Sequence, residues 1–284
     1  MNVIRASKYE PMAMTTIGGF VQRNTDTKKA GMLFDFGYLS TDLYKADVSA
    51  EYKQSPEMTM TILDNQKEFI DGFMKPISGE TIAFFIKQGW DMKFLAYLVV
   101  EAIEIPYEDF EPEDQAEIRE RYPSRIRRNT AGIEFIRIPN DPGDEDQAFE
   151  RMIESNVDRM EIQETRTGDG LTDKFVIPGV RAELVVRSPQ GVLSYLGELA
   201  RMSMSPSQKG EVPAIDGEPL FLVNRLSKKP GNAVVSVLHR GAFYSIPTSP
   251  ANRSMAALNL VQQLIDLQEK KIDQNPSSIR LIGN

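Results

Sequence analysis

Residues 187–199 read RSPQGVLSYLGEL, and residues 234–246 read VVSVLHRGAFYSI. The first stretch predicts a helix, because Ser188 can accept the free amide hydrogens of a first turn and Pro189 suits the first helical position. The second predicts two antiparallel strands, 233–238 and 242–246, joined by a tight turn at residues 239–241. Helices packed on antiparallel strands predict an α+β fold.

Apolar spacing extends this prediction to the whole C-terminal part. A strand at 220–226 joins the same sheet, and a closing helix at 251–271 covers it together with the helix near 190–201. Tyr195 is expected to connect its helix to the sheet. Apolar side chains of the closing helix should pack on the same layer, chiefly Leu258, Val261 and Ile265.

The section before it, residues 64–128, is predicted to be helical. Asp64, Ser78 and Asp91 are suitable N-caps for helices that follow them, the last of which we expect over 92–103. Trp90 falls in the short join between two of these helices. We expect Trp90 and Phe94 to stabilise the section by packing, with ligand stacking as the alternative for Trp90.

Residues 106–128 carry a run of acidic residues followed by arginines, which is typical of a solvated surface excursion or a subunit contact. Beyond them, residues 132–138 and 182–187 are predicted strands and 147–157 a short helix. Residues 140–146 and 168–173 are predicted as a turn and a loop. These features divide the chain into residues 1–63, 64–128 and 129–284.

The N-terminal part, residues 1–63, is rich in predicted strands. Residues 46–53 alternate apolar and polar positions, and weaker strands are expected at 17–22, 32–38 and 58–63, which together favour an antiparallel meander. An ordinary half-buried sheet explains this pattern. The alternative is a hairpin over 18–53 that pairs with neighbouring subunits into a closed ring, since closure removes exposed edges. The candidate contact residues are Phe34, Phe36, Tyr38, Val48 and Tyr52.

Composition excludes several classes of function. The 284 residues include no cysteine and one histidine, so thiol catalysis, disulfides, cysteine-ligated metals and any two-histidine metal site are excluded. The formal net charge of −8 has the wrong sign for nucleic-acid binding. No apolar run is long enough for a transmembrane helix, and the first residues lack the pattern of a secretory signal.

The remaining candidate chemistry is weak. Paired carboxylates could serve glycoside hydrolysis, but the acids lie in runs beside arginines. Residues 141–146 have acids at spacings that differ from a calcium loop, and His239 at a tight turn is expected to satisfy local backbone groups. No phosphate-binding glycine pattern occurs. We therefore assign no catalytic, cofactor-binding or metal-binding residue.

The chain resembles a poorly characterised family of Gram-negative outer-membrane lipoproteins. The resemblance lies in residues 2–12 (NVIRASKYEPM), 55–64 (SPEMTMTILD) and 69–78 (FIDGFMKPIS), and in the two stretches quoted first. Family members carry a signal peptide and a lipid-bearing cysteine upstream of the part matching 2–12, and this sequence has neither. The resemblance implies the periplasm or outer membrane if the N-terminus has been removed, and otherwise the chain is expected to be cytoplasmic.

We expect a non-enzymatic structural component of a bacterial cell-envelope assembly that associates with itself, with other envelope proteins as further candidate partners. The alternative is a soluble intracellular interaction or adaptor module, which the missing signal and cysteine favour. A carboxylate-dependent glycan hydrolase is a third hypothesis. It requires two carboxylates facing one pocket.

Overall fold

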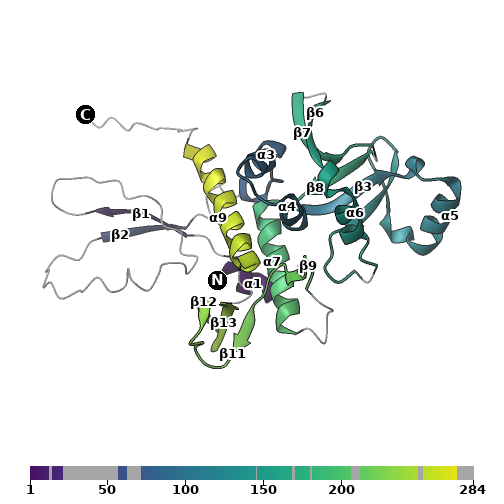
Figure 1. Cartoon of the computed structure of the whole chain (residues 1–284). Coiled ribbons are helices and arrows are strands. Elements are labelled where there is room, and N and C mark those ends of the chain that lie inside the picture. Colours follow the sequence, from purple (N-terminus) through teal and green to yellow (C-terminus); the bar gives the residue numbers. More distant parts are fainter. Residues whose placement is uncertain are drawn as a thin grey trace, which may run out of the picture.

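The computed structural model describes residues 1–12, 15–21, 57–62, 72–144, 146–167, 170–179, 181–205, 212–248 and 252–273. The fold is α+β, as predicted (Figure 1). Its buried apolar residues form one cluster that runs from the N-terminal helix through the large sheet to the C-terminal helix. The two sheets described below therefore share a continuous core.

Within the described residues, the largest sheet has six strands in the order β4-β5-β3-β8-β7-β6, and every pair in it is antiparallel. The central strand β3 pairs with β5 on one side and with β8 on the other. The strands are β3 (Val100–Pro106), β4 (Ile126–Arg128), β5 (Glu134–Pro139), β6 (Glu161–Thr167), β7 (Gly170–Ile177) and β8 (Ala182–Val186). The predicted boundary after residue 128 falls inside this sheet, between β4 and β5.

Two predictions for this region were wrong. The helix expected over 92–103 ends at Val99, and residues 100–106 form β3. Ala102 and Ile103, on opposite faces of the strand, are both fully buried, so the apolar run shows no clean alternation and also fits helical spacing. The loop expected at 168–173 is also wrong, because residues 170–173 belong to β7, whose pairing with β6 overrides their polar, turn-like composition.

Short helices surround the large sheet, and their caps follow the sequence. Ser78 Oγ accepts a hydrogen bond from Thr81 N at 3.3 Å, and Asp91 Oδ1 accepts one from Phe94 N at 2.6 Å. Two predicted caps are therefore confirmed. The helices around the large sheet are α3 (Gly79–Lys87), α4 (Met92–Val99), α5 (Pro112–Arg121) and α6 (Ala148–Asn156). Helix α5 lies in the acidic and basic run at 106–128 and has no buried residues.

A three-stranded sheet forms the C-terminal layer, in the order β11-β13-β12. Its strands are β11 (Asn224–Leu226), β12 (Ala233–His239) and β13 (Ala242–Pro247). The predicted tight turn is confirmed, with positive φ at both Arg240 (47°) and Gly241 (77°), as a two-residue hairpin requires. The strand predicted at 220–226 covers only 224–226. Since β11 and β12 both pair antiparallel with β13, they run parallel, and residues 227–232 cross β13 to join them.

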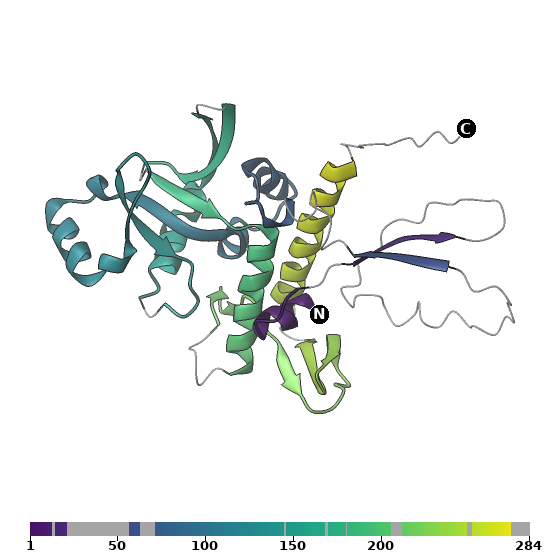
Figure 2. The same ribbon diagram turned by 180° about the vertical axis from the view of Figure 1, so that it is seen from behind.

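Helices α7 (Pro189–Met204), α9 (Asn252–Asp273) and α1 (Asn2–Ser7) lie beside this small sheet (Figures 1 and 2). Ser188 Oγ accepts a hydrogen bond from Gly191 N at 3.0 Å, which confirms the predicted cap of α7. Helix α1 approaches α7 so closely that a Cβ on Gly197 would lie 2.7 Å from Ala6 Cβ and 2.8 Å from Ser7 N. Glycine at position 197 therefore permits this contact.

Candidate functional site

A two-stranded antiparallel ribbon projects from the body of the molecule in both views (Figures 1 and 2). It consists of β1 (Thr15–Val21) and β2 (Glu57–Ile62), and it pairs Ile17 with Met60 and Phe20 with Met58 around an irregularity at Gly18. The strands predicted at 17–22 and 58–63 are therefore confirmed. The other candidate contact residues of this segment, Phe34, Phe36, Tyr38, Val48 and Tyr52, lie outside the described residues.

Both outer edges of this ribbon are unpaired within the part of the chain that the structure describes. Unpaired edges expose main-chain donors and acceptors that can pair with another chain. An isolated two-stranded ribbon is also only marginally stable in water. The ribbon is therefore a candidate site for pairing with another chain.

A buried arginine lies where the large sheet meets α7. The guanidinium of Arg187 donates hydrogen bonds to main-chain oxygens at the end of α4, in β3 and after β5, namely those of Leu98 (3.2 Å), Val100 and Asn140 (3.0 Å). The Asn140 amide donates to the Tyr97 and Val100 oxygens at 2.8 Å each. The Tyr195 hydroxyl donates to Asn140 Oδ1 at 2.9 Å. These bonds connect one end of the large sheet to α7.

No carboxylate pairs with Arg187 among the described residues, so main-chain dipoles and the Tyr195 ring compensate its charge. Burial lowers the pKa of Arg187 to about 10, so it remains protonated at neutral pH. Burial also raises the pKa of Tyr195, whose hydroxyl therefore stays neutral. Because Arg187 stays protonated and buried, its role is to hold these main-chain oxygens by hydrogen bonds and not to transfer protons.

An apolar pocket of about 140 Å³ lies between α1, α9 and the small sheet. Val3 and Ile4 contribute from α1, Val235 and Val237 from β12, and Leu258 from α9. Its polar side chains are the tyrosine, serine, asparagine and glutamine at positions 244, 245, 259 and 262, and Met1 also borders it. These residues provide no charge that could orient a polar substrate, and the described pocket residues carry no acid–base pair.

The structure places the other predicted packing residues in two groups. Phe94, Val261 and Ile265 are buried in the core. Trp90 is half-buried between Phe85, with ring centroids 5.8 Å apart, and Phe94, at 6.1 Å. One side of Trp90 borders an open depression that also includes Arg253.

Two acids that border the same depression are matched with arginines. Glu108 and Glu134 border one open depression, but Glu108 pairs with Arg181 at 3.0 Å and Glu134 pairs with Arg128 at 2.7 Å. Hydrogen bonding to the arginines lowers the pKa of Glu134, so it cannot act as a proton donor near neutral pH. Glu134 therefore cannot supply the protonated acid that glycoside hydrolysis needs.

Asp144, Asp146 and His239 also have protein partners. Arg125 Nη2 lies 2.8 Å from Asp144 Oδ2 and 3.5 Å from Asp146 Oδ2. His239 Nε2 lies 3.2 Å from Glu10 Oε1, so its partner is a carboxylate from the N-terminal segment and not the local backbone. Within the described residues, no group of three or more metal-ligating side chains comes together.

Sequence interpretation assigned no role to Arg187 or Asn140, although Arg187 begins the first quoted stretch. A charged residue followed directly by a helix cap gives no indication that it is buried, because its partners are distant in the chain.

None of the helices in the described part of the chain is both long and apolar enough to cross a bilayer. No family model matches the chain, and neither the curated proteins nor the solved structures contain a significant match.

Proposed function

We propose that the chain is a non-enzymatic structural subunit that associates with copies of itself through the β1–β2 ribbon. The observation that carries this proposal is the projecting ribbon, whose two outer edges are unpaired within the described residues. Pairing between ribbons of neighbouring subunits would satisfy these edges and give each ribbon the additional strands that stability in water requires.

The envelope setting of this assembly rests on the sequence resemblance. It is tested separately, by fractionating cells that express the complete gene and locating the protein by immunoblot. Recovery in the membrane or periplasmic fraction supports the envelope setting. Recovery in the cytosol favours the alternative, an intracellular interaction or adaptor module.

The assembly is tested by measuring the particle mass of the purified chain by native mass spectrometry at micromolar concentration. We expect a discrete multiple of 32.0 kDa. Replacing residues 15–62 with a short Gly-Ser linker should give a monomer, since Thr15 and Ile62 are paired neighbours and a short linker can join the flanking chain. A wild-type monomer would contradict the proposal.

A point variant separates strand pairing from general damage. Met60→Lys introduces a charge in β2 and should weaken association. Met74→Lys is the matched control, because Met74 is 58% exposed outside the ribbon and should leave the mass unchanged. Equal effects of the two substitutions would remove the ribbon as the contact.

A further inference from the structure

The small C-terminal sheet lies in a segment of chain without a single acidic residue. Between Glu218 and Asp266 the sequence contains no aspartate or glutamate, although the whole chain has a formal net charge of −8. The same segment carries five cations, Arg225, Lys228, Lys229, Arg240 and Arg253. Positive charge is therefore concentrated on one part of an acidic protein.

Most of these cations are available to a ligand. Arg253 forms ion pairs with Asp216 at 3.3 Å and with Glu218 at 3.2 Å, so it is not free for a ligand. Arg240 contacts Glu10 at 3.1 Å, yet its side chain remains 74% exposed. The ion pairs found among the described residues include none with Arg225, Lys228 or Lys229, and all three residues are exposed.

A row of apolar side chains with exposed members lies on one face of the small sheet. Leu226 and Leu238 both stand opposite Phe243 in the strand register, so the three residues lie in one row across β11, β13 and β12. Leu226 is 38% exposed and Leu238 is 57% exposed. Val234, on the same strand as Leu238 and four residues before it, is 41% exposed. Arg225 stands opposite Tyr244 and so lies on the other face of the sheet, and Arg240 pairs with Glu10. We call Leu226, Val234, Leu238 and Phe243, with Lys228 and Lys229 of the loop that follows Leu226, the basic apolar face.

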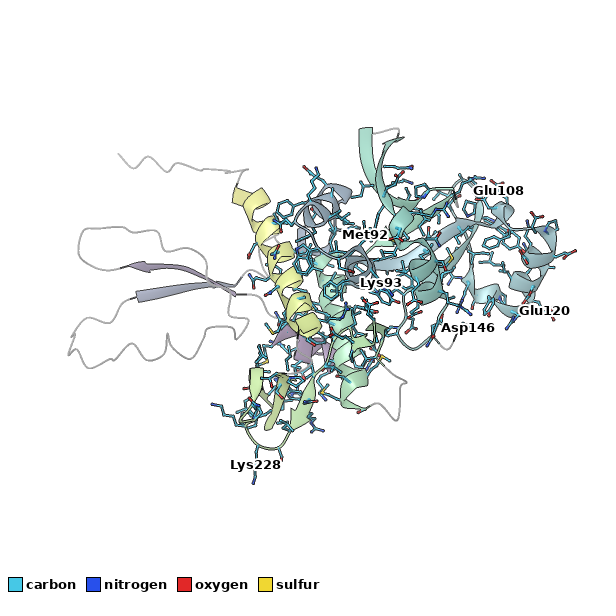
Figure 3. All side chains as sticks on the ribbon, viewed as in Figure 1. Met92, Lys93, Glu108, Glu120, Asp146 and Lys228 are labelled. Carbon is cyan, nitrogen blue, oxygen red and sulfur yellow. The ribbon has the colours of Figure 1, made fainter. Side chains whose placement is uncertain are left out.

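This face lies at an extremity of the molecule. In Figure 3, Lys228 points away from the body at the tip of the small sheet, on the side opposite the sticks of the large sheet. Residues 227–232, which contain both lysines, cross β13 between the two parallel strands. Lys228 and Lys229 therefore lie in the loop that begins directly after Leu226, at the end of the apolar row.

We propose that the basic apolar face binds the surface of a bilayer that contains anionic lipids. Lysine and arginine are attracted to the negative surface potential, while exposed leucine and valine side chains enter the boundary between headgroups and acyl chains. A nucleic acid would use the cations but would leave the apolar row exposed to water. The bilayer is the partner that matches both components of the face. This inference is independent of association through the ribbon.

The test is flotation of the full chain with vesicles of phosphatidylcholine alone and with 30% phosphatidylglycerol. We expect binding only to the anionic vesicles and a strong decrease between about 50 and 500 mM salt, because the Debye length shortens. Lys228→Gln/Lys229→Gln should weaken binding by about 30-fold. Lys75→Gln/Lys87→Gln removes two exposed lysines elsewhere and should leave binding unchanged.

A second variant tests the apolar component. Leu226→Ser/Leu238→Ser should reduce binding at high salt more than at low salt, since the apolar contribution is not screened. Unchanged circular dichroism establishes that each variant is folded. Absence of binding to anionic vesicles at low salt overturns the proposal, as does equal loss in both lysine pairs. Binding of a DNA duplex that is unaffected by Leu226→Ser/Leu238→Ser, without vesicle binding, assigns the cations to nucleic acid instead.

Discussion

The guanidinium of Arg187 lies over the ring of Tyr195, with Cζ 4.0 Å from the ring centroid. Arg187 directly follows β8 and Tyr195 belongs to α7, so this contact joins the large sheet to that helix. Because Asn140 bonds to both residues, the three side chains form one buried polar unit. Its loss should affect the whole domain, since removing the Arg187 or Asn140 side chain would leave main-chain oxygens without donors. Removing the Tyr195 hydroxyl would leave Asn140 Oδ1 without its donor.

Arg187→Met should lower the free energy of unfolding by about 3 kcal/mol, because buried oxygens lose their donors while the volume is largely kept. The measurement is urea denaturation at pH 7. Arg181→Met is the control, since the Arg181 side chain is 64% exposed and its ion pairs lie at the surface. If the two substitutions cost the same, the buried network contributes little.

Gly197→Ala should destabilise the protein by about 1–3 kcal/mol, because the new Cβ would overlap α1 at Ala6 and Ser7. The chain backbone supplies part of this contact and cannot move aside as a flexible side chain would. Thermal unfolding measures the effect. Gly231→Ala is the control, with open space around the added Cβ. A neutral Gly197→Ala would show that α1 can shift without cost.

Glu150→Gln should stabilise the protein near neutral pH. Burial raises the pKa of Glu150, with Asp144 and other acids adding to the effect, and its Oε2 has no hydrogen-bond partner in the described structure. A raised pKa means that the folded state favours the protonated acid, so stability is lost as the pH rises through this pKa. Glutamine removes that loss.

We expect a gain of about 1 kcal/mol at pH 7 that disappears near pH 4, where the acid of the wild type is protonated. Denaturation at both pH values measures it. Glu113→Gln, an exposed position on α5, should show no such pH dependence. A gain that persists at low pH would assign the effect to packing and not to charge.

Trp90→Ala should cost about 2–3 kcal/mol, less than a fully buried tryptophan, because one side of the ring borders the open depression beside Arg253. The lost contacts are those with Phe85 and Phe94. The thermal midpoint measures the change. Phe84→Ala provides the comparison, since Phe84 is 42% exposed and should cost less. A larger loss at Phe84 would contradict this assignment.

Local chemistry predicted the elements whose determinants are adjacent in sequence. The start of α7 at Ser188 and Pro189, and the turn at Arg240 and Gly241, depend on capping and turn geometry within a few residues. Strand β3 could not be distinguished from a continuation of α4, because its burial comes from strands that are distant in the sequence on both sides.

The candidate sites also could be predicted only where their determinants are adjacent in the sequence. The acid-free segment from 219 to 265 can be counted in the sequence, but the alignment of Leu226, Phe243 and Leu238 depends on a register that only the folded sheet defines. Arg187 was quoted for its place before a helix cap. Its burial depends on oxygens from Leu98 and Asn140, and neither lies near it in the chain.

The contact between Glu10 and His239 has a consequence for synthesis of the chain. The two residues are 229 positions apart, and α1 packs on α7, which is also made late. At ordinary rates of translation, about 10 to 50 s pass between the emergence of the two partners. During that time Val3 and Ile4, buried in the finished protein, have no surface to pack on. The apolar residues of α1 therefore stay without their final packing partners during synthesis until the last third of the chain has emerged.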